Sequence, residues 1–154
     1  MCRLLKGSIL LVITGILILS ASCTPGSCYD ETEAYVKASL FSFTTKKISP
    51  PDSITIYGLN MSTKLYNAQK NVSIAKLPLN PQNGKSIFVI KINNIADTLE
   101  FNYTSSVHLI SKECGYAYFH YIETPIFTHN AIDSISVSAN NVTTGNEENI
   151  RIFY

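Results

Sequence analysis

The sequence has little charge and no tryptophan: Asp, Glu, Lys and Arg make up only 15% of its 154 residues, whereas apolar residues make up 45%. This composition excludes both a strongly basic nucleic-acid binder and a disordered tail. Without residues 1–22, ten basic and eleven acidic side chains remain, which gives the rest of the chain a formal charge of −1. Such a chain has no field to attract a polyanion, so we expect no nucleic-acid partner.

Motifs that mark catalytic sites are also missing. The sequence has no GxSxG for a nucleophilic serine, no HExxH for zinc, and neither GxGxxG nor GxxxxGK[ST] for phosphate groups. We therefore expect a protein that is not an enzyme and that carries no cofactor or metal. The alternative is a small hydrolase or metal-dependent enzyme built from loops, whose candidate residues are His108 and His120 on neighbouring expected strands, with Glu123 nearby.

The N-terminal residues have the three parts of an export signal. Arg3 and Lys6 form a short basic stretch, the apolar run Ile9–Leu19 follows, and small residues occupy positions 20–22. A transmembrane helix needs about 20 apolar residues, so this run is too short to be a permanent membrane span. The sequence therefore predicts a signal peptide over residues 1–22 and an exported protein.

Cys23 directly follows the small residues, and the segment Leu19–Cys23 resembles the lipobox of bacterial lipoproteins, whose cysteine receives a diacylglyceryl group before cleavage. One acyl chain binds a bilayer only marginally, whereas two or three hold a protein stably. We therefore expect acylated Cys23 to anchor the protein in a lipid bilayer of the cell envelope, specifically the outer membrane, with its periplasmic and surface faces both open. The alternative is an ordinary secretory signal, with Cys23 as a thiol or disulfide partner.

The four cysteines fall into distinct roles. Cys2 lies in the signal peptide and Cys23 is assigned to the lipid, which leaves Cys28 and Cys114 as an even pair in an oxidising compartment. We expect a disulfide bond between them. The alternatives are two reduced, buried thiols, or a two-cysteine metal site, which is disfavoured because neither residue belongs to a CxxC pair or has a nearby histidine at ligand spacing.

Strand-forming residues dominate the chain after residue 34. Runs rich in Ile, Val, Phe, Tyr and Thr alternate with turns rich in Pro, Gly, Asn and Asp, and several runs place apolar residues at every second position. The pattern predicts an all-β domain, a two-sheet antiparallel sandwich of the immunoglobulin-like kind, with a small β-barrel as the alternative. The nine expected strands are Val36–Thr44, Ser53–Leu59, Val72–Leu77, Ser86–Ile92, Thr98–Tyr103, Val107–Ser111, Tyr116–Ile122, Ser134–Ala139 and Asn149–Phe153.

Tyrosine occurs nine times. Tyr116, Tyr118 and Tyr121 lie around Phe119 and His120 in one expected strand, which gives each face of that strand an aromatic stripe. Exposed aromatic side chains can stack on sugars or peptides. The alternative is that these tyrosines only fill a strand, because aromatic residues favour a pleated surface.

Several short segments recur in a recognisable order: Cys23 with Cys28 five residues later, Ala38–Phe43, Lys76–Asn80, Asp97–Tyr103, and Ser111–Gly115 leading into Phe119. In this order and spacing they resemble a family of small lipoproteins of Bacteroidota that is defined only as a domain of unknown function. The resemblance implies an exported β domain with paired cysteines. It implies no known activity.

Three Asp-Ser/Thr triplets, which begin at Asp52, Asp97 and Asp133, resemble the O-glycosylation site that many Bacteroidota use on exported proteins. The alternative is strand entry, with the aspartate in a turn and a β-forming residue at the start of the strand. The candidate O-glycosylation sites are Ser53, Thr98 and Ser134.

The expected chain thus has three parts: the signal peptide over residues 1–22, the lipidated cysteine with a short polar tether over residues 23–34, and a single β-sandwich domain over residues 35–154. We expect this domain to act as a non-catalytic binding or structural module of the cell envelope, with an envelope protein or a glycan as its partner. A sandwich fold alone does not identify the ligand, because sandwiches host many unrelated functions.

Overall fold

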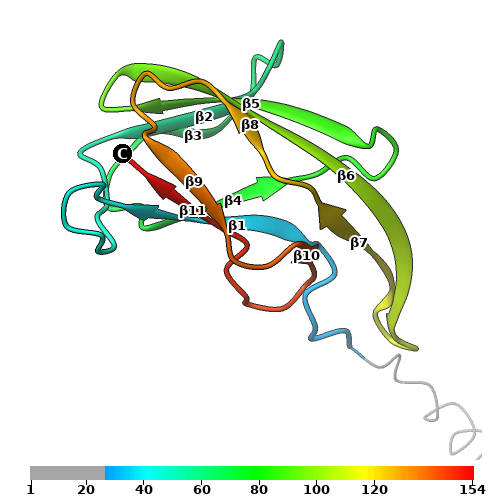
Figure 1. The fold of residues 1–154 in the computed structure, drawn as a ribbon. Coiled ribbons are helices and arrows are strands. Elements are labelled where there is room, and N and C mark those ends of the chain that lie inside the picture. Colours follow the sequence, from blue (N-terminus) through cyan, green and yellow to red (C-terminus); the bar gives the residue numbers. More distant parts are fainter. Residues whose placement is uncertain (1–26) are drawn as a thin grey trace, which may run out of the picture.

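The computed structural model describes residues 27–154, and these residues form two β-sheets (Figure 1). The expected signal peptide and Cys23 lie outside the described residues. Within residues 27–154, no helix is long and apolar enough to cross a membrane. The expected all-β domain with two sheets is confirmed.

The first sheet has the strand order β4-β1-β11-β9. β1 (Tyr35–Phe41) pairs antiparallel with β4 (Ile74–Pro78) and parallel with β11 (Ile150–Phe153), which pairs antiparallel with β9 (Ser134–Val137). The parallel pair departs from the expected antiparallel sandwich. A parallel pair requires a long crossover connection, and here the chain between the first and last strands supplies it.

The second sheet has the strand order β10-β7-β6-β5-β2-β3, and β8 pairs with β6 beside this path. β6 is 17 residues long: its first part pairs with β5 and its second part with β7. The sheet curls along this strand into a half-barrel (Figure 1). The strands of this sheet are β2 (Ile54–Gly58), β3 (Lys64–Gln69), β5 (Lys85–Ile92), β6 (Ile95–Ser111), β7 (Gly115–Ile122), β8 (Ile126–Phe127) and β10 (Asn141–Val142).

The expected and observed strands differ at β6 and at three minor strands. The sequence predicts separate strands at Thr98–Tyr103 and Val107–Ser111, but residues 104–106 continue the extended backbone between them. These residues are Thr and Ser, and threonine fits a strand as well as a turn. The unpredicted strands β3, β8 and β10 carry little or no alternating apolar pattern, because β3 is mostly exposed and the other two have two residues each.

The core lies between the sheets and uses side chains at every second position of the strands. Ile54 and Ile56 in β2 are fully buried, as their alternation predicts. In β6 the inward positions are buried as far as Tyr103, whereas Val107 and Leu109 are 56% and 59% exposed. The other large, fully buried side chains are Leu40, Leu77, Ile90, Ile92, Leu99, Phe101, Ile122, Ile132, Ile150 and Ile152.

Asp97, near the start of β6, is a buried carboxylate that holds the loop between β8 and β9. Asp97 is only 2% exposed. One oxygen accepts hydrogen bonds from the Thr128 hydroxyl (2.6 Å) and the Asn130 N–H (2.8 Å), and the other accepts from the N–H groups of Ala131 (2.7 Å) and Ile132 (2.9 Å). Burial alone would raise the pKa of Asp97, but these four donors outweigh it and hold the pKa below its usual value.

A second buried polar group, the amide of Asn149, holds the segment that contains β10. The Asn149 side-chain oxygen accepts from the Lys37 N–H at 3.0 Å, and its side-chain nitrogen donates to the carbonyl oxygens of Asn141 (2.9 Å) and Ala139 (3.2 Å). One buried side chain therefore connects β1, the segment after β9, and β10. This contact fixes β10 beside β7.

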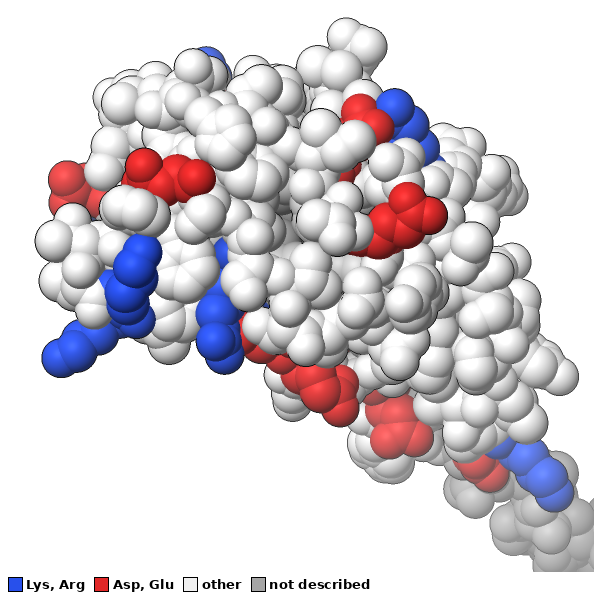
Figure 2. All heavy atoms as spheres, viewed as in Figure 1, with Lys and Arg blue, Asp and Glu red and all other residues white. Residues whose placement is uncertain are grey.

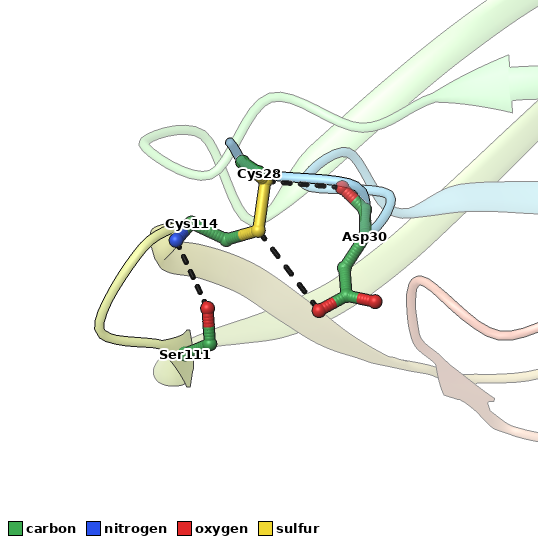
Figure 3. The surroundings of a disulfide bond; sticks show 4 residues. All are labelled: Cys28, Asp30, Ser111 and Cys114. Atoms are coloured by element: carbon green, nitrogen blue, oxygen red, sulfur yellow. Dashed lines mark hydrogen bonds between the residues drawn. A yellow bond between two sulfur atoms is a disulfide. The ribbon is translucent and has the colours of Figure 1, made fainter. Parts of the chain in front are cut away.

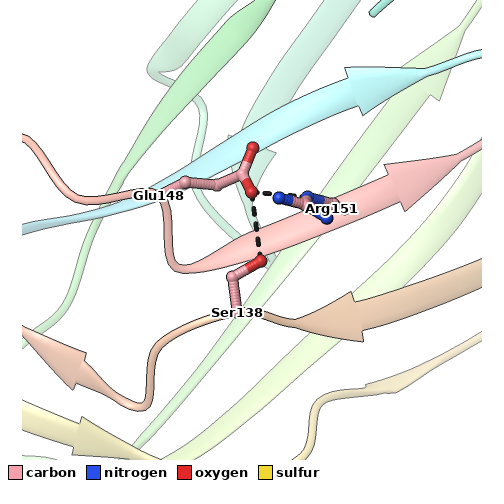
Figure 4. A network of polar contacts seen from close by, with 3 residues as sticks. All are labelled: Ser138, Glu148 and Arg151. Carbon is pink, nitrogen blue, oxygen red and sulfur yellow. Dashed lines mark hydrogen bonds and ion pairs between the residues drawn. The ribbon is translucent and has the colours of Figure 1, made fainter. Parts of the chain in front are cut away.

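Glu148 stabilises the same region from its outer side (Figure 4). Its carboxylate pairs with the Arg151 guanidinium at 2.6 Å and accepts a hydrogen bond from the Ser138 hydroxyl at 3.0 Å. Burial opposes the charged form, but hydrogen bonds from Ser39, Arg151 and Ser138 lower the pKa of Glu148 overall. Asn149 thus holds the connection from β9 to β11 on its buried side, and Glu148 holds it on its outer side.

Cys28 and Cys114 form a disulfide bond, as the sequence predicts (Figure 3). Their Cα atoms are 4.8 Å apart, which is an ordinary disulfide separation. Cys114 lies in the turn between β6 and β7, where its N–H donates to the Ser111 hydroxyl at 3.0 Å. The bond therefore attaches the segment before β1 to the tip of the β6–β7 hairpin.

Reduction of this disulfide should destabilise the domain while preserving its strands. The bond closes a loop of 86 residues, and removal of a cross-link of this kind lowers the free energy of unfolding by about 2–4 kcal/mol. Thermal unfolding monitored by far-UV circular dichroism should show a lower Tm with reductant and an unchanged low-temperature spectrum. A Cys28→Ser variant should melt at that lower temperature with or without reductant; an unchanged Tm would contradict the prediction.

Replacement of Asp97 by asparagine should destabilise the domain by about 2–4 kcal/mol at pH 7, because two backbone N–H donors would then face an amide NH₂ group instead of a carboxylate oxygen. The pKa of Asp97 is lower in the folded state than in the unfolded chain, so its stabilising effect is complete above the unfolded value of about 3.9 and is lost as the pH falls further. Urea titrations of the wild type and of Asp97→Asn at pH 7 and pH 3 measure the difference in their free energies of unfolding at each pH. Asp133→Asn, an exposed change near the same loop, is the control and should have little effect at either pH.

Candidate functional site

The outer half of the β6–β7 hairpin exposes apolar side chains on the face that continues the core. Opposed pairs on this face are Val107 with Tyr118 and Leu109 with Tyr116, and these four side chains are between 49% and 70% exposed. We call them the inner-face cluster. Figure 1 shows the hairpin extending beyond the strands of the first sheet, so no strand of that sheet covers the inward face of β6 and β7 there. The segment before β1 lies beside part of this face, because Thr32, Glu33 and Ala34 line one pocket with Tyr118.

The opposite face of the same hairpin forms a second surface, with β10 at its side. Tyr121 lies between its strand partners Thr104 on β6 and Asn141 on β10. These residues line a groove of about 340 Å³, which we call the outer-face groove, together with Ser105, Ser106, His108, Phe119, His120, Val142 and Thr143. No Asp, Glu, Lys or Arg is among the residues that line it.

The expected aromatic stripes on β7 are therefore exposed on both faces. Tyr116 is 70% exposed and Tyr118 49% exposed on the inner face, and Tyr121 is 53% exposed on the outer face. Figure 2 shows that uncharged atoms cover most of the visible surface over the hairpin. These tyrosines are surface residues, so core packing does not explain their number in this strand.

The histidines proposed for an enzymatic site belong to opposite faces of the β6–β7 hairpin, and both are among the residues that line the outer-face groove. His120 is buried on the inner face, where its Nδ1 lies 2.8 Å from the Ser105 hydroxyl, and burial lowers the pKa of its imidazole. His108 lies on the outer face, with its ring stacked on Phe119 at a centroid distance of 4.4 Å. Glu123 is exposed beyond the end of β7. Residues 27–154 contain no group of three or more His, Cys, Asp or Glu side chains placed to hold a metal ion.

The Asp-Ser/Thr triplets occupy different structural positions. Asp52 and Asp133 lie just before β2 and β9, which fits the strand-entry interpretation, whereas Asp97 lies within β6 and uses its carboxylate in the loop contacts described above. The hydroxyl residues of all three triplets are half-buried. O-glycosylation at these positions stays a prediction.

A larger apolar groove of about 470 Å³ lies elsewhere, between the β2–β3 hairpin and the connection from β4 to β5. Its lining includes Leu59, Met61, Leu65 and Phe88, and Lys85 is its one charged lining residue. The groove therefore lacks the convergent acids and bases of a catalytic site. Sequence patterns could not reveal it, because two stretches that are separate in the sequence, residues 58–65 and 78–88, contribute its walls.

Comparisons with known proteins agree with the resemblance to a family without an assigned activity. The chain matches no curated protein and no solved structure at a significant level. Residues 53–154, which are more than half of the chain, match the model of a family described as "Family of unknown function (DUF6452)". The chain therefore belongs to the family of unknown function DUF6452.

Proposed function

We propose that this protein is a membrane-anchored lipoprotein whose β-sandwich acts as a non-catalytic binding module of the cell envelope. In this proposal lipid on Cys23 holds the chain in the outer membrane, residues 24–34 form the tether, and the domain is an immunoglobulin-like sandwich. The lineage in Bacteroidota belongs to the same proposal. It is supported by the export signal and the cysteine that follows it in the sequence.

One observation carries the binding role: a single hairpin presents exposed aromatic or aliphatic side chains on both faces. Leu109 and Tyr116 are 59% and 70% exposed on one face, and Tyr121 is 53% exposed on the other. Soluble domains rarely leave such side chains clustered without a partner, and tyrosine is enriched where proteins bind other molecules. The disulfide at the hairpin tip further stabilises this surface.

A binding module fits the site better than the enzymatic alternative does. An enzyme of the expected kind would gather His108, His120 and Glu123 in one pocket. Both histidines line the outer-face groove, but His120 is buried against the Ser105 hydroxyl, His108 is stacked on Phe119, and Glu123 is not among the lining residues. The outer-face groove instead presents neutral hydroxyl, amide and aromatic groups. These groups suit recognition, and no carboxylate is among the lining residues to complete an acid–base set with the two histidines.

The anchor predicts where the protein fractionates. Wild-type protein should remain with membranes and partition into detergent, because two or three acyl chains bind a bilayer stably. Cys23→Ala should release the protein or leave it unprocessed, and labelling with radioactive palmitate should be lost. Cys28→Ala is the matched control and should keep both properties; wild-type protein found wholly in the soluble fraction would contradict the anchor.

Capture of a partner from cross-linked envelope extracts tests the binding role. A double change, Leu109→Ser with Tyr116→Ser, should reduce recovery of a hairpin-dependent partner at least about tenfold, because it removes exposed apolar contact area. Ile126→Ser is the control, since Ile126 is 60% exposed on β8, outside the hairpin. The proposal fails if no protein or glycan is recovered, or if the double variant and the control lose the same partners.

A further inference from the structure

The outer-face groove has an ordered arrangement of side chains set by strand register. β7 supplies its central row, with Tyr121 and Phe119 two positions apart on one face. Thr104 and Ser106 on β6 are their direct partners, and Asn141 on β10 is the partner of Tyr121 on the other side. Aromatic rings thus lie in the centre, with hydroxyl and amide groups on both sides.

The aromatic part of the groove extends from β7 toward β6. The His108 imidazole stacks on the Phe119 ring with an interplanar angle of 18°, so the two rings lie nearly parallel. The His108 Nε2 also lies 3.1 Å from the Ser106 hydroxyl. This contact orients the imidazole over Phe119 and leaves Tyr121, which is 53% exposed, as the most accessible ring of the groove.

The polar groups beside Tyr121 are available to a ligand. Thr104, Tyr121 and Asn141 are all exposed, and no hydrogen bond to another described residue engages their side-chain polar atoms. The groove therefore offers hydroxyl and amide groups that both donate and accept hydrogen bonds, next to an aromatic ring face. The absence of charged lining residues disfavours an ionic ligand.

A sugar ring has the complementary chemistry. Its C–H groups form apolar faces with a partial positive charge that pack on the negative face of an aromatic ring, and its hydroxyls point outward from the rim. The volume of about 340 Å³ falls at the lower end of the range for small-molecule sites, which is about 300–1,000 Å³. A site of this size fits a short segment of an oligosaccharide.

We propose that the outer-face groove binds a neutral saccharide, which stacks on Tyr121 and hydrogen-bonds to Thr104 and Asn141. This inference rests on the proposed binding function and names its ligand class. A protein partner would fit the inner-face cluster better, because that surface presents apolar side chains in opposed pairs. The two faces of the hairpin therefore suit ligands of different chemistry.

Binding to defined saccharides tests the proposal. The full-length lipoprotein, held in a zwitterionic detergent that contains no sugar, would be applied to immobilised neutral oligosaccharides (glucans, mannans, galactans and xylans) and to anionic ones (polygalacturonate and heparin). We expect binding to at least one neutral class and none to the anionic classes. Affinity would then be measured by titration with the soluble form of the bound oligosaccharide.

Variants in the groove and outside the hairpin provide matched controls. Tyr121→Ala should weaken saccharide binding at least tenfold, and Tyr121→Phe should keep most of it because the ring face is retained. Tyr29→Ala changes a tyrosine that is 92% exposed outside the hairpin and should leave saccharide affinity within twofold. Thr104→Val should weaken binding several-fold, whereas Thr104→Ser should preserve it. Unchanged Tm values would show that each variant is folded.

The results distinguish this inference from the proposed function. The saccharide site is overturned by no binding to any neutral class, by binding to anionic glycans alone, or by affinity that Tyr121→Ala does not change. If a hairpin-dependent protein partner is still captured in that case, the binding module stands and only its ligand class is wrong. If capture also fails, both proposals fall.

Discussion

The two-residue period of a single strand, β6, links the core of this domain to its exposed surface. Side chains at alternate positions of a strand point to the same face whether or not another sheet covers that face. Leu99, Phe101 and Tyr103 therefore point into the core, and Val107 and Leu109 continue the same row beyond it. The apolar pattern continues along β6, but the first sheet does not extend over the whole strand. The candidate surface lies on the part of β6 that the first sheet does not cover.

Buried polar groups hold parts of the chain that β6 does not hold in place. The carboxylate of Asp97 accepts four hydrogen bonds from the loop between β8 and β9, and the amide of Asn149 holds β10 against the rest of the domain. Such groups are stable in a low-dielectric interior only when their partners are in place. They therefore fix short segments that have few apolar side chains. The position of Asn141 in the outer-face groove follows from one of these contacts.

Much of the fold could be predicted from the sequence, because the alternation of Ile54 and Ile56, for example, reports a buried strand face directly. The cysteine pair was also predictable, since elimination left Cys28 and Cys114 alone together. Local patterns could not predict which alternating residues are covered: Val107 and Leu109 have the same pattern as core residues and are exposed. Nor could they predict that Asn141 lies beside Tyr121, because that pairing depends on the register between β7 and a strand of two residues.

The disulfide bond has a geometric consequence for the proposed anchor. Cys28 follows Cys23 by five residues, and an extended chain of that length spans at most about 18 Å. Because Cys28 is bonded to Cys114 at the hairpin tip, lipid on Cys23 would place that tip, rather than the far end of the sandwich, next to the bilayer. The hairpin is also continuous with the core through β6, so it would hold the domain close to the membrane surface. The inner-face cluster and the outer-face groove would then both face molecules that lie at that surface.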